Sequence, residues 1–184
     1  ASAGGRGDLK LDRSAPLSAA ELAALRPPEK LTVTEWAEQE RVLSANYSGS
    51  PGPWRSATTP YVREILDSFT DQGTEEIVII SSRQVAKSTT IENLLGYVMR
   101  QDPGPAQLVL PSEKDAHDAL DRIKDMILHS PALLEERTPW KKDWRKDGIQ
   151  TRRMPLHLGW AGGSSTLKGR SNRWLFLDEV EAYE

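Results

Sequence analysis

Three features of the sequence predict an α/β fold in which helices flank a parallel β-sheet. Short apolar segments suited to strands alternate with longer segments of helical periodicity. This alternation is typical of parallel strands joined by right-handed crossovers. In addition, two of the apolar segments run directly into polar loops, after residues 80 and 177. Parallel sheets bind ligands beyond the carboxyl ends of their strands, so these loops are candidates for a functional site.

The length and composition indicate one globular domain. The chain has 184 residues, of which 38% are hydrophobic and 28% are charged, enough for a sizeable core. No apolar run approaches the roughly 20 residues of a membrane span, and the first residues lack the apolar segment of a signal peptide. The absence of cysteine excludes disulfides and fits a reducing compartment. The net charge of −3 restricts any contact with DNA to a local basic patch.

The expected elements follow from periodicity and from capping residues. Residues 1–30 are expected to form a flexible arm, and residues 31–184 a single domain. A helix over residues 32–45 is expected to have Thr34 as its N-cap, and the Pro- and Gly-rich residues 47–60 to lack regular structure. Ser112 is expected to cap a long helix. The other expected elements are helices at residues 60–70, 89–100, 113–129 and 130–136, buried strands at 76–80, 107–110 and 174–177, and one or two strands within 149–160.

Residues 76–89, EIVIISSRQVAKST, have the order of a phosphate-binding P-loop, which is strand, turn, Lys-Ser/Thr and helix. The turn and the helix N-terminus direct backbone N–H groups toward phosphates. Lys87 would reach the β- and γ-phosphates, and the Ser88 hydroxyl would bind Mg²⁺. However, Ser81 and Ala86 occupy the two glycine positions of the usual motif. The alternative is a buried strand followed by an ordinary N-capped helix.

A second apolar segment, WLFL at residues 174–177, ends in Asp178 and Glu179. In an NTPase the first carboxylate holds Mg²⁺, directly or through water, and the second orients and activates the attacking water. Alone, two such acids more often simply begin a solvated turn. Together with the upstream loop in one α/β chain, they indicate the Walker B segment of a P-loop ATPase.

Arg83 lies inside the predicted phosphate loop. A cation there would stabilise charge on the transferred γ-phosphoryl group, as an arginine finger in cis. The alternative is an Arg that faces solvent or pairs with Glu75 or Glu76. From the residues alone, both interpretations stay open.

A basic segment is the candidate for DNA contacts. Residues 140–153 contain six Lys and Arg side chains with two tryptophans between them. Lys168, Arg170 and Arg173 add three more cations. Such side chains are suited to contacts with the phosphate backbone. The alternative is a solvated surface with Trp140 and Trp144 packed inward.

Several stretches carry a family resemblance in their order along the chain. They are EWAEQERVLS at residues 35–44, PGPW at 51–54, TTPYVRE at 58–64, SSRQVAKST at 81–89, and the segment 163–180 that ends in WLFLDEV. In combination they resemble the ATPase domain of phage large terminase subunits of the lambda type, which package DNA. The resemblance covers residues 34 to 184.

The resemblance implies a RecA-like P-loop NTPase fold with an additional strand, the ASCE class, which binds ATP and Mg²⁺. Four residues are implied to contact the adenine, Tyr61 by stacking: Trp54, Thr59, Pro60 and Tyr61. The implied contacts of the phosphate loop are Ser82, Arg83, Gln84, Val85, Ala86, Lys87, Ser88 and Thr89. The implied metal ligands are Ser88 and Asp178, and the implied catalytic residues are Glu179, Arg83 and Lys87.

For function, the resemblance implies a Mg²⁺-dependent ATPase that drives double-stranded DNA into procapsids in the host cytoplasm. The implied partners are double-stranded DNA, the terminase small subunit and the portal of the procapsid, with a homo-oligomeric ring during packaging. Two other functions stay compatible with the residues. One is a helicase-like P-loop translocase, and the other is a degenerate P-loop docking module that does not hydrolyse nucleotide.

Two departures from the family pattern affect these expectations. Ala86 replaces the glycine before the Lys. If this position needs a positive φ, the alanine costs about 1–2 kcal/mol of strain. The chain also ends six residues after Asp178. We therefore expect a domain truncated after the Walker B strand, without the coupling motif, the C-terminal nuclease domain or nuclease activity.

Overall fold

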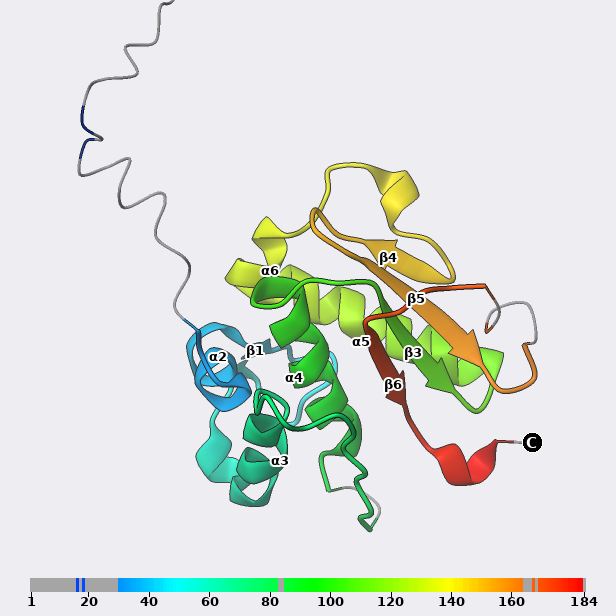
Figure 1. Cartoon of the computed structure of the whole chain (residues 1–184), viewed down its shortest axis with the longest axis horizontal. Helices are drawn as coiled ribbons and strands as arrows, with labels where there is room; N and C mark the ends of the chain where they lie inside the picture. The colour runs from blue at the N-terminus through cyan, green and yellow to red at the C-terminus, as the bar shows by residue number, and fades with distance from the viewer. Residues whose placement is uncertain are drawn as a thin grey trace, which may run out of the picture.

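The computed structural model of the chain describes residues 16, 18, 30–82, 85–163, 167 and 169–183, and these residues form an α/β arrangement (Figure 1). Its helices and strands are α2 (Val33–Glu40), β1 (Val42–Leu43), β2 (Gly52–Pro53), α3 (Arg63–Ser68), α4 (Lys87–Arg100), β3 (Ala106–Leu110), α5 (Glu113–His129), α6 (Pro131–Glu135), β4 (Gly148–Gln150), β5 (Pro155–Trp160) and β6 (Trp174–Leu177). Its short 3₁₀ turns are η1 (Ser56–Thr58), η2 (Pro60–Val62), η3 (Lys141–Asp143) and η4 (Val180–Ala182). The flexible arm expected at residues 1–30 lies almost entirely outside the described residues.

The main sheet has the strand order β4-β5-β3-β6 in the described part of the chain. Strand β3 is parallel to both of its neighbours, whereas β4 is antiparallel to β5. The expectation of a purely parallel sheet is therefore wrong, because residues 148–160 form two closely spaced strands that pair with each other. In Figure 1, α5 passes behind β3 and β5, while α4 lies between the sheet and helices α2 and α3.

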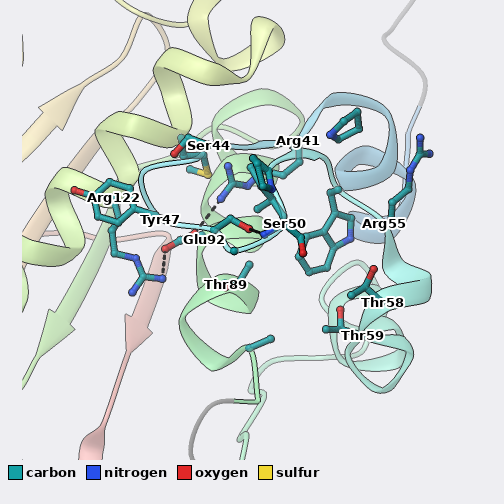
Figure 2. A pocket seen from close by; sticks show the side chains of 18 of the residues that line it. Arg41, Ser44, Tyr47, Ser50, Arg55, Thr58, Thr59, Thr89, Glu92 and Arg122 are labelled. Atoms are coloured by element: carbon teal, nitrogen blue, oxygen red, sulfur yellow. Dashed lines mark hydrogen bonds and ion pairs between the residues drawn. The ribbon is translucent and has the colours of Figure 1, made fainter.

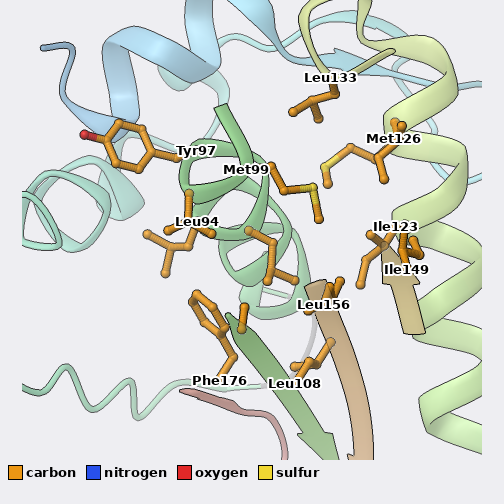
Figure 3. Packing of buried hydrophobic residues seen from close by; sticks show 14 of the residues in the cluster. Leu94, Tyr97, Met99, Leu108, Ile123, Met126, Leu133, Ile149, Leu156 and Phe176 are labelled. Atoms are coloured by element: carbon orange, nitrogen blue, oxygen red, sulfur yellow. The ribbon is translucent and has the colours of Figure 1, made fainter. Parts of the chain in front are cut away.

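Strand β3 lies at the centre of the core, and all five of its residues are buried. Side chains from α4, α5, α6 and the strands point into this shared core (Figure 3). Both long helices turn an apolar face toward this core. The buried residues of these faces are Leu94, Leu95 and Val98 on α4 and Ala116, Leu120, Ile123 and Ile127 on α5. Ile91 is only partly buried. Among the described helices, none is long and apolar enough to cross a membrane.

The strand predicted at residues 174–177 exists as β6, but most of it is not buried. Among the described strands it is the last in the sheet order and pairs with β3 alone. Phe176 faces the core and is 7% exposed, whereas Leu175 and Leu177 are 59% and 48% exposed. The apolar composition therefore predicted the strand correctly and its burial wrongly. Side chains alternate between the two faces of a strand, and the face of β6 with Leu175 and Leu177 is largely uncovered.

The buried strand predicted at residues 76–80 is wrong. These residues belong to no strand, and Val78 and Ile80 are 72% and 94% exposed. Apolar, β-branched residues show that a segment fits a pleated and half-buried surface. They do not supply the neighbouring strand that its backbone N–H and C=O groups require. Within the described residues, no strand pairs with this segment.

The N-terminal region differs from the expectation in three details. The helix expected over residues 32–45 ends at Glu40, and Val42 and Leu43 instead form β1. Helix α2 is capped by Thr32 rather than Thr34, because Thr32 and Glu35 form a capping box and satisfy each other's backbone N–H. Residues 47–60 also contain regular structure, since β2 pairs antiparallel with β1. Gly52 makes this possible with φ at 126°, a conformation that other residues rarely adopt. The cap predicted at Ser112 is confirmed.

Candidate functional site

The predicted phosphate loop leads into α4, whose first residue is Lys87. Ala86 is the N-cap of this helix and has left-handed backbone angles, φ 60° and ψ 21°. Its carbonyl accepts hydrogen bonds from both the N–H and the hydroxyl of Thr90, at 2.8 and 2.9 Å. Residue 86 therefore has a positive φ, the conformation in which an alanine was expected to cost about 1–2 kcal/mol of backbone strain.

The turn after β6 carries the second predicted motif. The N–H of Asp178 donates to the carbonyl of Val109 at 3.0 Å, which continues the pairing of β6 with β3. Glu179 then turns the chain with left-handed angles, φ 52° and ψ 45°. Ala86 and Glu179 are the two non-glycine residues with positive φ in the described part of the chain. Strained backbone of this kind is concentrated at functional sites, which points to these two turns together.

The two turns meet in space although they are far apart in sequence. The Ser88 hydroxyl donates to Oδ2 of Asp178 at 3.3 Å. Both residues and Glu179 line a cavity of about 160 Å³, hereafter the acidic cavity. A hydroxyl beside a carboxylate is a suitable oxygen donor set for Mg²⁺, which commonly binds one or two protein ligands and takes the rest from phosphates and water. The described residues contain no cluster of three or more His, Cys, Asp or Glu able to hold a metal.

A larger cavity of about 470 Å³ is lined by residues of α4, α5 and the segment around β2 (Figure 2). We call it the main cavity. Four predicted nucleotide contacts line it: Trp54, Thr59, Ala86 and Thr89. Trp54 is buried and its indole N–H donates to the Ser56 hydroxyl at 3.1 Å, so its ring is fixed in the wall. The buried hydroxyl of Thr59 has no hydrogen-bond partner in the described structure, which leaves it available to a ligand.

Glu92 of α4 joins two arginines at the boundary of these cavities. Its two carboxylate oxygens pair with Arg41 at 3.0 Å and with Arg122 of α5 at 2.6 Å. Figure 2 shows Glu92 between the two guanidinium groups. The Arg41 side chain is only 5% exposed, and this burial lowers the pKa of Arg41 although the charge of Glu92 opposes the shift. Sequence reasoning missed this network, because the partners are 30 or more residues apart and no local pattern connects them.

A second group on the wall of the main cavity is centred on Asp125 of α5. Ser44 and Asn46 donate hydrogen bonds to its carboxylate, the latter at 2.7 Å. Burial alone would raise the pKa of Asp125, but these hydrogen bonds and nearby cations lower it. Asp125 therefore stays ionised and anchors the loop after β1 to α5. This residue, too, was not predicted from the sequence.

The charges on the two cavity walls differ in sign. The main cavity is lined by three cations, Arg41, Arg55 and Arg122, and by two carboxylates, Glu92 and Asp125. The acidic cavity is lined by one described cation, Arg122, and by five carboxylates, which are Glu92, Asp115, Asp118, Asp178 and Glu179. The charges that line the main cavity therefore nearly balance, whereas the strongly negative acidic cavity favours a cation.

The remaining predicted contacts are not brought to these cavities by the described structure. Arg83 and Gln84 lie outside the described residues. Ser82 is exposed, Val85 and Lys87 are half-buried, and none of the three lines either cavity. Tyr61 is 56% exposed and also lies outside the cavity walls. The roles expected of these residues, and of their neighbour Pro60, stay predictions.

The basic segment is partly packed and partly exposed. Trp144 packs against the core beneath the guanidinium of Arg137, which lies 4.8 Å from the ring centroid. Trp140 is 63% exposed, so the interpretation with both tryptophans packed inward is wrong for this residue. Arg173 pairs with Asp102 at 2.6 Å. Lys168 lies outside the described residues.

Comparison with known proteins agrees with this arrangement. The model of one family, described as phage terminase large subunit gpA, ATPase domain, matches residues 48–184. The chain belongs to this family. The matched region includes β2, the Ala86 turn, α4 and the Asp178–Glu179 turn, so both halves of the candidate site lie within the terminase domain. The family resemblance inferred from the sequence is thereby confirmed.

Two curated terminase proteins are similar to the chain. The large subunit of the terminase of Escherichia phage lambda is 24% identical over 170 residues, which cover 90% of this chain and 26% of that protein. The large subunit of the terminase of Enterobacteria phage P21 is 24% identical over 181 residues, which cover 95% of this chain and 28% of that protein. The chain thus spans about a quarter of the length of these relatives. No solved structure gives a significant match to it.

Proposed function

We propose that this terminase domain binds ATP together with Mg²⁺ across the two cavities and hydrolyses it to drive DNA packaging. The observation that carries the proposal is the 3.3 Å hydrogen bond from Ser88 to Asp178. It joins the N-terminus of the helix that begins with Lys87 to the carboxyl end of β6. A helix N-terminus favours phosphate, and the adjoining carboxylates favour a metal ion, so one Mg²⁺-nucleotide satisfies both.

The main cavity is proposed to hold the adenosine part of ATP. Its volume of about 470 Å³ suits a ligand of this size. Trp54 supplies an apolar wall, and the Thr59 hydroxyl supplies a hydrogen bond to the ligand that it lacks within the protein. The phosphates then pass Ala86 and Thr89 toward the acidic cavity. Lys87, which lies outside both cavity walls, and the first backbone N–H groups of α4 are proposed to reach them there.

The acidic cavity is proposed to hold the metal and the attacking water. Ser88 and Asp178 would bind Mg²⁺, which neutralises charge on the phosphate oxygens when bound. Glu179 orients a water molecule and takes its proton while the water oxygen attacks the γ-phosphorus and the bond to the β–γ bridging oxygen breaks. Arg83 stabilises the charge that develops on the γ-phosphoryl group. The left-handed turn at Glu179 sets the direction of its carboxylate.

At the level of the whole assembly, we propose that hydrolysis drives double-stranded DNA into a procapsid in the host cytoplasm. The proposed partners are the DNA, the terminase small subunit and the portal, with several copies of the motor forming a ring. The membership in a terminase large-subunit family supports this role. The exposed cations and Trp140 of the basic segment are the first candidates for contacts with the DNA backbone.

Binding and hydrolysis are tested with four variants of the chain. Lys87→Ala and Asp178→Asn are expected to abolish Mg²⁺-ATP binding in calorimetric titrations, since each removes a charge that faces the phosphates or the metal. Glu179→Gln is expected to bind ATP normally but to lose hydrolysis. Lys114→Ala, an exposed position on α5, is the control and is expected to behave as the parent chain. Unchanged binding in the Lys87 variant contradicts the proposal.

The second candidate function is a docking module that has kept the fold and lost the reaction. Two observations favour it: the strained alanine in the phosphate loop and the absence of residues 76–80 from the sheet. A parent chain that binds no ATP at millimolar concentration supports this function instead of the first.

A further inference from the structure

We propose that Arg122 is an additional phosphate-binding residue, placed at the junction of the two cavities to bind the phosphate chain of the nucleotide. This inference rests on the proposed function. It concerns a residue outside both sequence motifs, on α5, a helix for which the sequence predicted no functional residue.

The first argument is the position of Arg122. Of the described residues, only Arg122 and Glu92 line both the main cavity and the acidic cavity. A ligand with its adenosine in the main cavity and its terminal phosphate near Asp178 therefore has to pass these two side chains. Its phosphates are the part of the ligand that spans the junction, because they connect adenosine to the metal.

The second argument is the difference between the two arginines that Glu92 binds. Arg41 is buried, and its donors are used by Glu92 at 3.0 Å, by Asn93 at 3.3 Å and by the carbonyl of Val42 at 2.8 Å. Arg122 is 34% exposed, and within the described structure its one polar partner is Glu92. Since a guanidinium group has five N–H donors, Arg122 retains several for a ligand. Arg41 is thus a structural residue, whereas Arg122 is available for binding.

The third argument is electrostatic. Arg122 is the one described cation on the wall of the acidic cavity, among five carboxylates. A triphosphate that enters such a cavity meets strong repulsion unless cations face it. The fixed fork of a guanidinium group matches phosphate oxygens better than an ammonium group does. Glu92 keeps this fork at the junction, so little conformational entropy is lost when the ligand binds.

The Glu92–Arg122 pair has a simpler explanation as a clamp between α4 and α5. The network itself allows the two roles to be separated, because Glu92 retains Arg41 as a partner when Arg122 is removed. No carboxylate is then left buried without a cation. The variant Arg122→Gln is therefore expected to fold, and its thermal unfolding is measured to verify this.

The test compares two ligands of different chemistry on the same chain. Calorimetric titration with Mg²⁺-ATP measures binding of adenosine and phosphates together, and titration with adenosine measures the main cavity alone. For Arg122→Gln we expect affinity for Mg²⁺-ATP to fall about ten- to a hundredfold, the range for one charge-assisted hydrogen-bond pair. Affinity for adenosine should not change. Arg122→Lys should restore part of the loss, and Lys114→Gln on the same helix should show none.

Three results would overturn the inference. Parent-like affinity of Arg122→Gln for Mg²⁺-ATP shows that Arg122 does not contact phosphate. If Lys87→Ala loses binding in the same experiment, the proposed function itself stays intact. Equal losses for ATP and adenosine show that Arg122 only maintains the shape of the main cavity. A parent chain that binds no ATP overturns the proposed function and this inference together.

Discussion

The two segments that lead into the candidate site are both rich in apolar residues but differ in structure. Residues 174–177 pair with β3 as the edge strand β6, and Phe176 enters the core. Residues 77–80 are also apolar, but they pair with no described strand and expose Val78 and Ile80. The difference teaches that a strand is specified by its neighbour as much as by its own composition.

The two halves of the site are therefore held in place by different means. The Asp178 turn is fixed by the β3–β6 pairing and by an aromatic contact, in which Phe176 stacks on Phe69 with ring centroids 6.2 Å apart. The Lys87 turn is fixed through α4, which lies so close to α2 that the ring of Trp36 occupies the space of a side chain at Gly96. Because residues 76–80 form no strand, it is the helix that positions Ala86 and Lys87.

The largest expected effect comes from removing one apolar side chain from each segment. Phe176→Ala should lower the free energy of unfolding by about 3–5 kcal/mol, the usual cost of deleting a buried phenyl ring. Ile80→Ala should change it by less than about 0.5 kcal/mol, because an exposed side chain loses no burial. Urea denaturation monitored by circular dichroism measures both values.

Leu175→Ala is the matched control for this pair, since Leu175 lies on β6 but is exposed. It should behave like Ile80→Ala, which separates the effect of burial from that of strand membership. A loss above about 1.5 kcal/mol for Ile80→Ala, a value typical of buried positions, would mean that residues 76–80 pack in solution. The comparison of the two segments would then be wrong.

Much of the fold was predictable because its signals are local. The 3.6-residue periodicity of α4 and α5, the Ser112 cap and the largely apolar β3 each depend on a few neighbouring residues. The Thr32 cap was missed because two threonines two residues apart offer the same hydroxyl, and only Glu35 distinguishes them. The placement of residues 76–80 was not predictable, because it depends on the presence of a distant strand.

The part of the site that lies in two short sequence motifs was predictable. Lys87, Ser88, Asp178 and Glu179 stand out in the sequence because loops with this chemistry follow apolar segments. The hydrogen bond between Ser88 and Asp178 agrees with that prediction, although the roles of these residues stay proposals. Arg41, Glu92 and Arg122 were missed, because they converge from three helical regions and each resembles an ordinary surface charge in the sequence.

A smaller effect is expected from relieving the strained residue in each half of the site. Ala86→Gly and Glu179→Gly should each raise the free energy of unfolding by about 0.5–1 kcal/mol. The relief of left-handed strain, roughly 1–2 kcal/mol, exceeds the added entropy cost of glycine, roughly 0.5–1 kcal/mol. The same urea denaturation measures the gain.

Ala119→Gly is the control, because Ala119 is a helical residue of α5 and should lose about 0.5–1 kcal/mol on the same change. A loss of stability in Ala86→Gly would mean that the left-handed turn is not adopted in solution. The two site variants should also differ from each other in function. Glu179→Gly should lose hydrolysis together with its carboxylate, while Ala86→Gly keeps every charged group of the site.

The smallest expected effect concerns Tyr183. This residue contributes to the Asp178 half of the site and not to the Lys87 half. Its hydroxyl donates to the carbonyl of Val109 at 2.8 Å, the same carbonyl that accepts from the N–H of Asp178. Burial, and then the charge of Asp178, raise the pKa of Tyr183 to about 12 from an ordinary value of 10.0. The folded state therefore favours the protonated phenol. Its contribution to stability is fully present below pH 10.0 and is lost as the pH rises toward about 12.

Tyr183→Phe should remove this part of the alkaline loss, so the parent chain and the variant should converge in stability as the pH rises from 9 to about 12. The difference between the two chains cancels the titration of other groups, including Tyr97, whose pKa is also raised by burial. A constant difference across this range would mean that the phenol is solvated and does not hold the turn.

Because the turn carries Glu179, convergence in stability should be accompanied by slower ATP hydrolysis in the variant at neutral pH, with unchanged ATP affinity. That pattern would show that the hydrogen bond from Tyr183 to β3 helps to hold the half of the site that is built on the sheet. The segment at residues 76–80 has no counterpart to this bond among the described residues.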